Sequence, residues 1–385
     1  MSSFESSKIS LSSQPSQSNL TENAMNRTWN FYAGPATLPA PAIERAKAEL
    51  PDWEGTGMSV METSHRSKEY DVVHYGAMEL MSELLGLDDD HQVLFIQGGA
   101  STQFAMVPMN FIPPGGSADF VDTGTWSTKA IKEAKIIADG RVAATSEPDG
   151  FTRIPKRDEY DLDPAAAYVH ITSNNTIKGT QYHDFPDVGD TPLVADMSSD
   201  FLWRPFDANK FSLIYAGAQK NIGPSGVTIA IVKKSWIETA NKNIPTMLRY
   251  STHSSKDSLY NTPPTFAIYM VRNVLEWVKD QGGLVGMEKR NRAKGDLLYS
   301  VITDHPDFYR CPVEPASRSY MNVVWRLPSE ELEAKFVAEA GAARMCGLKG
   351  HRSVGGCRAS IYNAMPMEGV EYLADFMTRF AAANR

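Results

Sequence analysis

Short apolar runs alternate with polar-faced stretches from residue 93 onward, and this pattern predicts strands that alternate with helices. The apolar run 93–96 predicts a buried strand, and the two glycines that follow lead into a predicted helix over 101–110. Further strands are predicted at 118–122, 167–172, 192–196, 213–216 and 227–232, and a further helix at 127–134. Strands that alternate with helices favour an α/β fold, in which a mostly parallel sheet is covered by helices on both faces.

The pattern changes near Gly282, where the regular alternation ends. The remaining residues predict a helix over 286–303, a strand over 320–326, a helix over 329–340, a strand over 357–362 and an amphipathic helix over 367–383. The chain has 385 residues, 42% of them hydrophobic, which is enough for two domains. We therefore expect a large domain over 27–281 and a smaller α+β domain over 282–385, with the first segment of the large domain contributing to the small one.

Residues 1–26 differ from the rest of the chain in composition. They are rich in Ser, Gln and Asn and contain few apolar residues. The apolar core of a secretory signal and the arginines of a transit peptide are both missing from this segment. We predict a disordered N-terminal extension.

Charge and cysteine content narrow the class of protein. The net charge of −8 gives no basic field, so we expect neither nucleic-acid nor membrane binding. No run of about 18 apolar residues occurs, so we expect no transmembrane helix. The three cysteines, Cys311, Cys346 and Cys357, lack the spacing of metal ligands and cannot all pair with one another. This usage favours a reducing, cytoplasmic compartment and no bound metal.

Lys220 lies in a turn of small residues directly after the apolar run 211–216. A lysine at the end of a buried strand is costly to desolvate, and its presence there requires a reason. Schiff-base chemistry is one such reason, because an amine with a depressed pKa attacks a carbonyl at neutral pH. In isolation such a lysine is more often structural or exposed.

Asp196 ends the predicted strand 192–196, at the same edge of the sheet as Lys220. A carboxylate at a buried strand end needs a cationic or hydrogen-bonding partner, and a structural ion pair or a turn cap would meet that need. Together with Lys220 it suggests a more specific role. Pyridoxal 5'-phosphate requires an acid that keeps its ring nitrogen protonated and a lysine that forms an imine with its aldehyde.

Three further features are weak signals by themselves. The glycine-rich segment 97–103 follows a strand and opens a helix, which suits an anion but also a tight turn without a ligand. Trp126 could stack on a planar cofactor ring, although a buried or surface tryptophan is the commoner explanation. Thr176 supplies a turn hydroxyl whose role depends on its surroundings.

Two loops, 63–67 and 350–358, contain arginines among small residues, with histidines beside two of them. The guanidinium group binds carboxylate and phosphate through two parallel hydrogen bonds. A single scattered arginine is usually a solvated charge. Three of them in such loops favour a pocket for a small substrate that is anionic at both ends.

The segments 30–39, 64–69, 216–221 and 350–356 together resemble the phosphoserine aminotransferases. These are class-V aminotransferases of fold type I that depend on pyridoxal 5'-phosphate. The resemblance runs from Trp29 to about Phe380. It implies a large domain with a mostly parallel sheet of the seven-stranded type, a smaller α+β C-terminal domain, and a homodimer whose active sites are shared between subunits.

The resemblance also implies roles for individual residues. Lys220 would form the imine with the cofactor and act as the base in catalysis, and Asp196 would contact the pyridine nitrogen. Trp126 would stack on the ring, and Thr176 would bond its phenolic oxygen. The cofactor phosphate would be bound by Ala100, Ser101 and Gln219, and by Asn261 and Thr262 of the partner subunit. The anionic groups of the substrate would be bound by His65, Arg66, His351, Arg352 and Arg358.

The implied reaction transfers an amino group from L-glutamate to 3-phosphohydroxypyruvate and yields O-phospho-L-serine and 2-oxoglutarate, in serine biosynthesis. The family also makes 4-phosphohydroxy-L-threonine for pyridoxine biosynthesis. A serine– or alanine–glyoxylate aminotransferase is an alternative, but it needs less phosphate-binding capacity than the two arginine loops offer. A cysteine desulfurase would need a reactive thiol, for which Cys346 and Cys357 are the nearby candidates. A non-catalytic carrier of the cofactor would not need the lysine, the aspartate and the arginines together.

Overall fold

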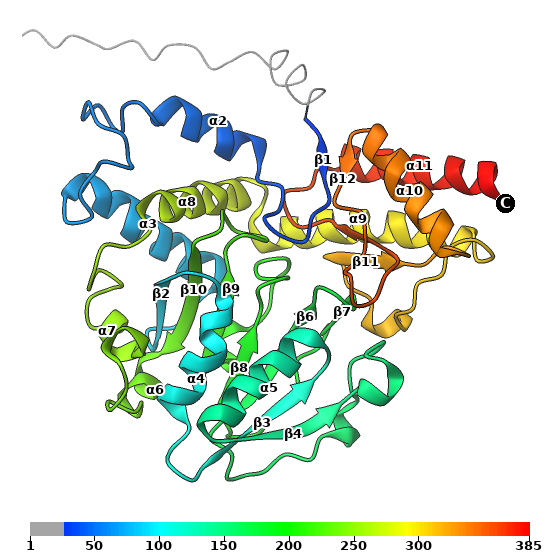
Figure 1. The fold of residues 1–385 in the computed structure, drawn as a ribbon. Coiled ribbons are helices and arrows are strands. Elements are labelled where there is room, and N and C mark those ends of the chain that lie inside the picture. Colours follow the sequence, from blue (N-terminus) through cyan, green and yellow to red (C-terminus); the bar gives the residue numbers. More distant parts are fainter. Residues whose placement is uncertain (1–26) are drawn as a thin grey trace, which may run out of the picture.

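The computed structural model describes residues 27–385, so the predicted extension over 1–26 lies outside the described residues. A seven-stranded sheet forms the centre of the molecule, with strands in the order β2-β10-β9-β8-β5-β3-β4 (Figure 1). The strands are β2 (His91–Gln97), β3 (Ser117–Asp122), β4 (Asp139–Thr145), β5 (Val169–Thr172), β8 (Leu193–Asp196), β9 (Leu213–Gly217) and β10 (Val227–Lys233). The strands predicted from the apolar runs are all present.

The sheet is mostly parallel, which confirms the predicted fold class. Strands β9, β8, β5, β3 and β4 are parallel to one another, whereas β10 is antiparallel to both β9 and β2. All residues of β5, β8 and β9 are buried, which is typical of parallel strands with both faces covered. The carboxyl ends of the parallel strands therefore meet at one edge, and the β9–β10 turn lies at that edge.

Helices cover both faces of the sheet. Ile229 and Ile231 of β10 pack into a core with α3 and α8, whereas Ala230 and Val232 pack into a core with α4 and α5 on the other face. The helix α3 begins after Ser67, whose side chain caps the Tyr70 N–H. The helices of this region are α2 (Ala40–Glu49), α3 (Lys68–Leu85), α4 (Gln103–Phe111), α5 (Thr125–Ile137), α6 (Lys234–Glu238), α7 (Tyr250–Ser254) and α8 (Thr265–Asp280).

A separate hydrophobic core lies between the C-terminal elements. These elements are α9 (Gly283–Asp304), β11 (Asn322–Trp325), α10 (Glu330–Ala342), β12 (Met345–Cys346), β13 (Cys357–Ser360) and α11 (Met367–Asn384). Strand β1 (Trp29–Asn30) pairs in parallel with β12, beside the C-terminal helices (Figure 1), and the Phe31 side chain enters this second core. The domain boundary between residues 281 and 282 stays a prediction, and α9 begins beside it.

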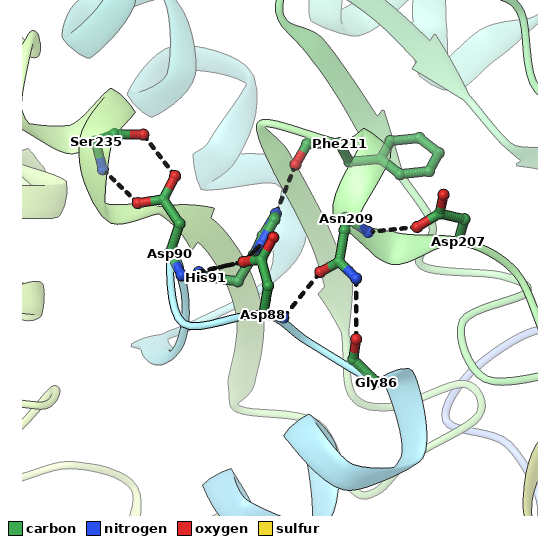
Figure 2. Close-up of polar contacts among 8 residues, drawn as sticks. All are labelled: Gly86, Asp88, Asp90, His91, Asp207, Asn209, Phe211 and Ser235. Atoms are coloured by element: carbon green, nitrogen blue, oxygen red, sulfur yellow. Dashed lines mark hydrogen bonds and ion pairs between the residues drawn. The ribbon is translucent and has the colours of Figure 1, made fainter.

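At the amino end of β2, side-chain contacts hold the strand to its neighbours (Figure 2). The buried His91 ring contacts the Asp88 carboxylate through Nδ1 at 2.7 Å and the Phe211 carbonyl through Nε2 at 2.9 Å. The Asn209 side chain donates to the Gly86 carbonyl at 2.9 Å and accepts from the Asp88 N–H at 3.0 Å. These contacts fix the sheet edge opposite the one that carries Lys220.

No helix within residues 27–385 is long and apolar enough to cross a membrane.

Candidate active site

A cavity of about 270 Å³ opens at the edge of the sheet where the parallel strands end. Connections that follow β2, β3, β8 and β9 line it, together with the short hairpin of β6 (Asn174–Asn175) and β7 (Thr180–Gln181) and the loop before β13. The predicted site residues that line the cavity are Ala100, Ser101, Trp126, Thr176, Asp196, Gln219, Lys220, His351 and Arg358.

Lys220 occupies the turn between β9 and β10. The turn is fixed by backbone hydrogen bonds, because the N–H groups of Ile222 and Gly223 donate to the Ala218 carbonyl at 3.2 and 2.8 Å. The Lys220 Nζ donates to Thr176 Oγ1 at 2.9 Å and to Ser199 Oγ at 2.8 Å. Ser199 was not among the residues predicted from the sequence, because a serine in a loop carries no signal of its own.

The surroundings of Lys220 lower its pKa to about 8. Burial is the main cause, because it disfavours the charged amine, and the positive charge of Arg358 adds to the effect. The carboxylates of Asp196 and Asp200 oppose it. Near neutral pH the Lys220 amine can therefore be present in both its charged and its neutral forms.

Asp196 is the last residue of β8 and is 6% exposed. Its Oδ1 accepts hydrogen bonds from the Ser198 N–H at 2.9 Å and from the Ser198 hydroxyl at 2.6 Å. Burial raises the pKa of Asp196, while the positive charge of Lys220 and the Ser198 contacts oppose the rise. Because Asp196 lines the cavity and both hydrogen bonds reach Oδ1, Oδ2 is left to face a ligand.

Trp126 lies in the first turn of α5, with its ring centroid 5.6 Å from the Lys220 Nζ. Its indole Nε1 is buried and has no hydrogen-bond partner among residues 27–385. Arg358 is 9% exposed, and its Nη1 donates to the Thr176 carbonyl at 3.4 Å. Its Nε is also buried without a partner in the described part of the chain. A buried guanidinium group in this state is suited to bind an anionic ligand.

The segment after β2 offers space for a phosphate group. A Cβ atom added at Gly98 or Gly99 would meet no atom within 4 Å, so the backbone here borders open space. Ala100 and Ser101 begin a helical turn, where backbone N–H groups have no partner within the helix. With the amine of Lys220 and the carboxylate of Asp196 facing the same cavity, the residues present fit pyridoxal phosphate.

Five of the predicted site residues do not line the cavity of this chain. The Thr262 carbonyl accepts a hydrogen bond from the Gln97 side chain, at the end of β2. The side chains of Arg66 and Arg352 are exposed, whereas Nε2 of His65 is buried and lacks a partner within the described chain. The five residues are His65, Arg66, Asn261, Thr262 and Arg352. Their roles stay predictions.

Comparisons with known proteins decide the family. The model of the class-V aminotransferases matches residues 28–373. A phosphoserine aminotransferase of Desulfatibacillum aliphaticivorans is 59% identical, over 93% of this chain and 99% of that protein, and one of Bacillus subtilis is 54% identical, over 94% and 100%. The chain belongs to the phosphoserine aminotransferases. The resemblance found in the sequence is thereby confirmed.

Solved structures of this family have the same fold. The phosphoserine aminotransferase of Bacillus circulans subsp. alkalophilus has a TM-score of 0.92 at 53% identity, over 93% of this chain and 99% of that one. The enzyme of Trichomonas vaginalis, solved with bound pyridoxal phosphate, has a TM-score of 0.87 at 38% identity, over 91% and 99%. An alanine–glyoxylate aminotransferase of Nostoc sp. has a TM-score of 0.74 at 15% identity, which shows a shared fold alone.

Proposed function

We propose that the protein is a pyridoxal-phosphate-dependent transaminase, which transfers an amino group from L-glutamate to 3-phosphohydroxypyruvate. The products are O-phospho-L-serine and 2-oxoglutarate, in serine biosynthesis. The observation that carries this proposal is the placement of four groups around one cavity: the Lys220 amine, the Asp196 carboxylate, the Trp126 ring and the Arg358 guanidinium, whose Nε has no partner within residues 27–385. Membership of the phosphoserine aminotransferases supports this reaction over that of a glyoxylate aminotransferase.

Residues of the cavity would hold the cofactor by its phosphate and its ring. Ala100 and Ser101 line the cavity, and their N–H groups would bind the phosphate, with Gln219 lining the same cavity. Asp196 would bind the ring nitrogen, Trp126 would pack against the ring, and the Thr176 hydroxyl would bond an oxygen substituent. When bound, pyridoxal phosphate supplies an aldehyde that links covalently to amines and a ring that withdraws electrons.

The amine of Lys220 is suited to accept and release a proton during the reaction. Its pKa of about 8 lies close to neutral pH, where a general base is most effective. The hydroxyl groups of Thr176 and Ser199, which also contact each other, hold the Nζ atom in place. Because a base must lie within hydrogen-bonding reach of the proton it moves, this orientation bears directly on the rate.

Arg358 and His351 would bind the anionic end of the substrate. The buried Arg358 guanidinium forms stronger hydrogen bonds with a carboxylate or phosphate than with a neutral group. The pKa of His351 is lowered, first by burial and then by the positive charges of Arg358 and Arg352. A neutral amino acid without a second anionic group would therefore bind less tightly than glutamate or a phosphorylated oxo acid.

We also propose a homodimer in which each active site is completed by the partner subunit. The segments that carry His65, Arg66 and Asn261 also expose large apolar side chains, with Met61 56% exposed and Tyr260 48% exposed. A partner subunit bound over these segments would cover such side chains from water. Light scattering would give the mass, and mixing Lys220→Ala with Arg66→Ala subunits would restore activity in hybrid dimers if the sites are shared.

Two finer assignments complete the proposal. Formation of 4-phosphohydroxy-L-threonine for pyridoxine biosynthesis would use the same anion-binding groups. A cytoplasmic location agrees with the presence of three free cysteines.

A substrate comparison tests the function directly. The purified protein, loaded with pyridoxal phosphate, is supplied with glutamate and one of three oxo acids: 3-phosphohydroxypyruvate, the oxo acid of 4-phosphohydroxythreonine, or glyoxylate. We expect the highest kcat/KM with 3-phosphohydroxypyruvate. A preference for glyoxylate would contradict the proposal.

A further inference from the structure

A second buried carboxylate, Asp200, lies four residues after Asp196 and is 4% exposed. Its two oxygens accept hydrogen bonds from different side chains. Oδ1 accepts from the hydroxyl of Ser173 in a short contact, and Oδ2 accepts from the Gln181 amide at 3.0 Å. No hydrogen bond joins Asp200 to Lys220 within residues 27–385. Asp200 also does not line the cavity.

The two partners of Asp200 lie at the two ends of one hairpin. Strands β6 (Asn174–Asn175) and β7 (Thr180–Gln181) form this hairpin; Ser173 precedes its first strand, and Gln181 ends its second. Both side chains are fully buried. Asp200 therefore holds together the base of the β6–β7 hairpin.

The connection between these two strands carries Thr176, which touches two groups of the active site. The Lys220 Nζ donates to Thr176 Oγ1 at 2.9 Å, and Arg358 donates to the Thr176 carbonyl at 3.4 Å. A change at the base of so short a hairpin displaces the residue at its tip. Small displacements of a reacting group are costly, because catalysis depends on the alignment of the groups involved.

A carboxylate suits the neighbours of position 200. The Gln181 Oε1 accepts from the Tyr320 N–H at 2.9 Å, so its amide nitrogen faces Asp200 as a donor. The Ser173 hydroxyl contacts both Asp200 Oδ1 and the Asp196 carbonyl, the latter at 3.1 Å. An ionised carboxylate accepts through charged oxygens, and such hydrogen bonds are stronger than those of a neutral asparagine amide.

Burial raises the pKa of Asp200 to about 6, while the contacts of Ser173 and Gln181 oppose the rise. The carboxylate is therefore ionised at neutral pH. Placing this charge in the interior is costly, and a positioning role would account for its presence.

We propose that Asp200 is a positioning residue, which sets the Thr176 hydroxyl against the Lys220 amine by clamping the base of the β6–β7 hairpin. The inference rests on the proposed function, since Lys220 is the group whose chemistry is adjusted. The negative charge of Asp200 also raises the Lys220 pKa directly. The part of its effect that depends on the hairpin is the part that is lost when Thr176 has no hydroxyl.

A double-mutant cycle tests this coupling. In the full-length protein without cofactor, NMR titration of labelled lysine gives the Lys220 pKa, with the signal assigned by Lys220→Ala. The Lys220 Nζ donates to the Thr176 hydroxyl, so Thr176→Val should lower this pKa by roughly 0.4 to 1 unit, the size of one hydrogen bond. Asp200→Asn should lower it as well, and the double variant should lower it by less than the sum of the two single shifts. Additive shifts would mean that Asp200 acts by its charge alone, and would overturn the proposal.

A second variant separates position from charge. Ser173→Ala removes one of the two clamping contacts and leaves the Asp200 carboxylate in place, so it should lower the Lys220 pKa in the same direction. An unchanged pKa in this folded variant would overturn the proposal, even if Asp200→Asn fails to fold. Asp119→Asn is the matched control, because Asp119 is a fully buried carboxylate that contacts Arg141 and the Asp163 N–H instead of the hairpin. It should leave the Lys220 pKa unchanged.

The holoprotein provides a second readout and separates the two proposals. With pyridoxal phosphate bound, the pH midpoint of the visible absorption should shift in Asp200→Asn and Thr176→Val but not in Asp119→Asn. Wild-type protein that develops no visible band would refute the proposed function, while the lysine titration would still decide the role of Asp200. A wild-type band together with unshifted midpoints would refute the role of Asp200 alone.

Discussion

The lowered pKa of Lys220 predicts how the cofactor-free protein takes up pyridoxal phosphate as the pH changes. At pH 7 a lysine with a pKa of about 8 is about one tenth neutral, whereas one with a pKa of 10.5 is about 0.03% neutral. The reactive neutral amine is therefore about 300 times more abundant than in an ordinary lysine. Uptake should accelerate about tenfold between pH 7 and pH 9 and then level off.

Stopped-flow absorption in the visible range measures this rate. Arg358→Gln removes a positive charge that lowers the Lys220 pKa, so the midpoint of the rate profile should move to higher pH. The exposed Arg379 lies on α11, outside the cavity lining, and Arg379→Gln should leave the midpoint unchanged. A wild-type rate that still rises steeply above pH 10 would show that burial does not activate Lys220.

Three further outcomes follow from the structure. Lys220→Ala should abolish the visible absorption of the bound cofactor, and a spectrum like that of the wild type would remove this lysine from the mechanism. Arg358→Ala should raise the KM for the phosphorylated oxo acid about 10- to 150-fold, because a charge-assisted hydrogen bond contributes about 1.5–3 kcal/mol; an unchanged KM would place the anion site elsewhere. Trp325→Ala should lower the free energy of unfolding by about 3–5 kcal/mol, since the ring is buried in the C-terminal core. Urea titration measures this change, and a loss below about 1 kcal/mol would contradict that packing.

Six of the seven strands of the central sheet could be predicted because each contains a short apolar run. Residues 213–216 and 227–232 were predicted as strands, and they correspond to β9 and β10. Lys220 and Asp196 could be predicted as neighbours because both follow strands of one sheet. This inference needs the order of elements along the chain but no knowledge of distances.

Other elements have no local sequence pattern that predicts them. Strands β1 and β12 have two residues each, and their pairing depends on contacts between the two ends of the chain. Strand β4 contains Asp139, Gly140 and Arg141, and it is held in place by β3 rather than by an apolar run of its own. In the same way, Ser199 contacts Lys220 because of how the loop after β8 folds back, which no spacing in the sequence indicates.

The predicted site residues that do not line the cavity could not be placed from local sequence patterns. His65, Arg66 and Arg352 were predicted from the resemblance as substrate-binding residues, and Asn261 and Thr262 as cofactor-binding residues of a partner subunit. Nothing in the spacing of these residues along the chain places them at the cavity. Their test is therefore the mass of the assembly and the activity of hybrid dimers.

The pairing of β1 with β12 has a consequence for folding of the protein during translation. Cys346 lies 317 residues after Trp29, and its Sγ contacts the Trp29 carbonyl. At roughly 5 to 20 residues per second, translation of the intervening chain takes about 15 to 60 s. Throughout that time β1 has no strand to pair with, and Phe31 has no core to enter. The half of the site that carries Arg358 therefore assembles last, after the half that carries Lys220 has already been translated.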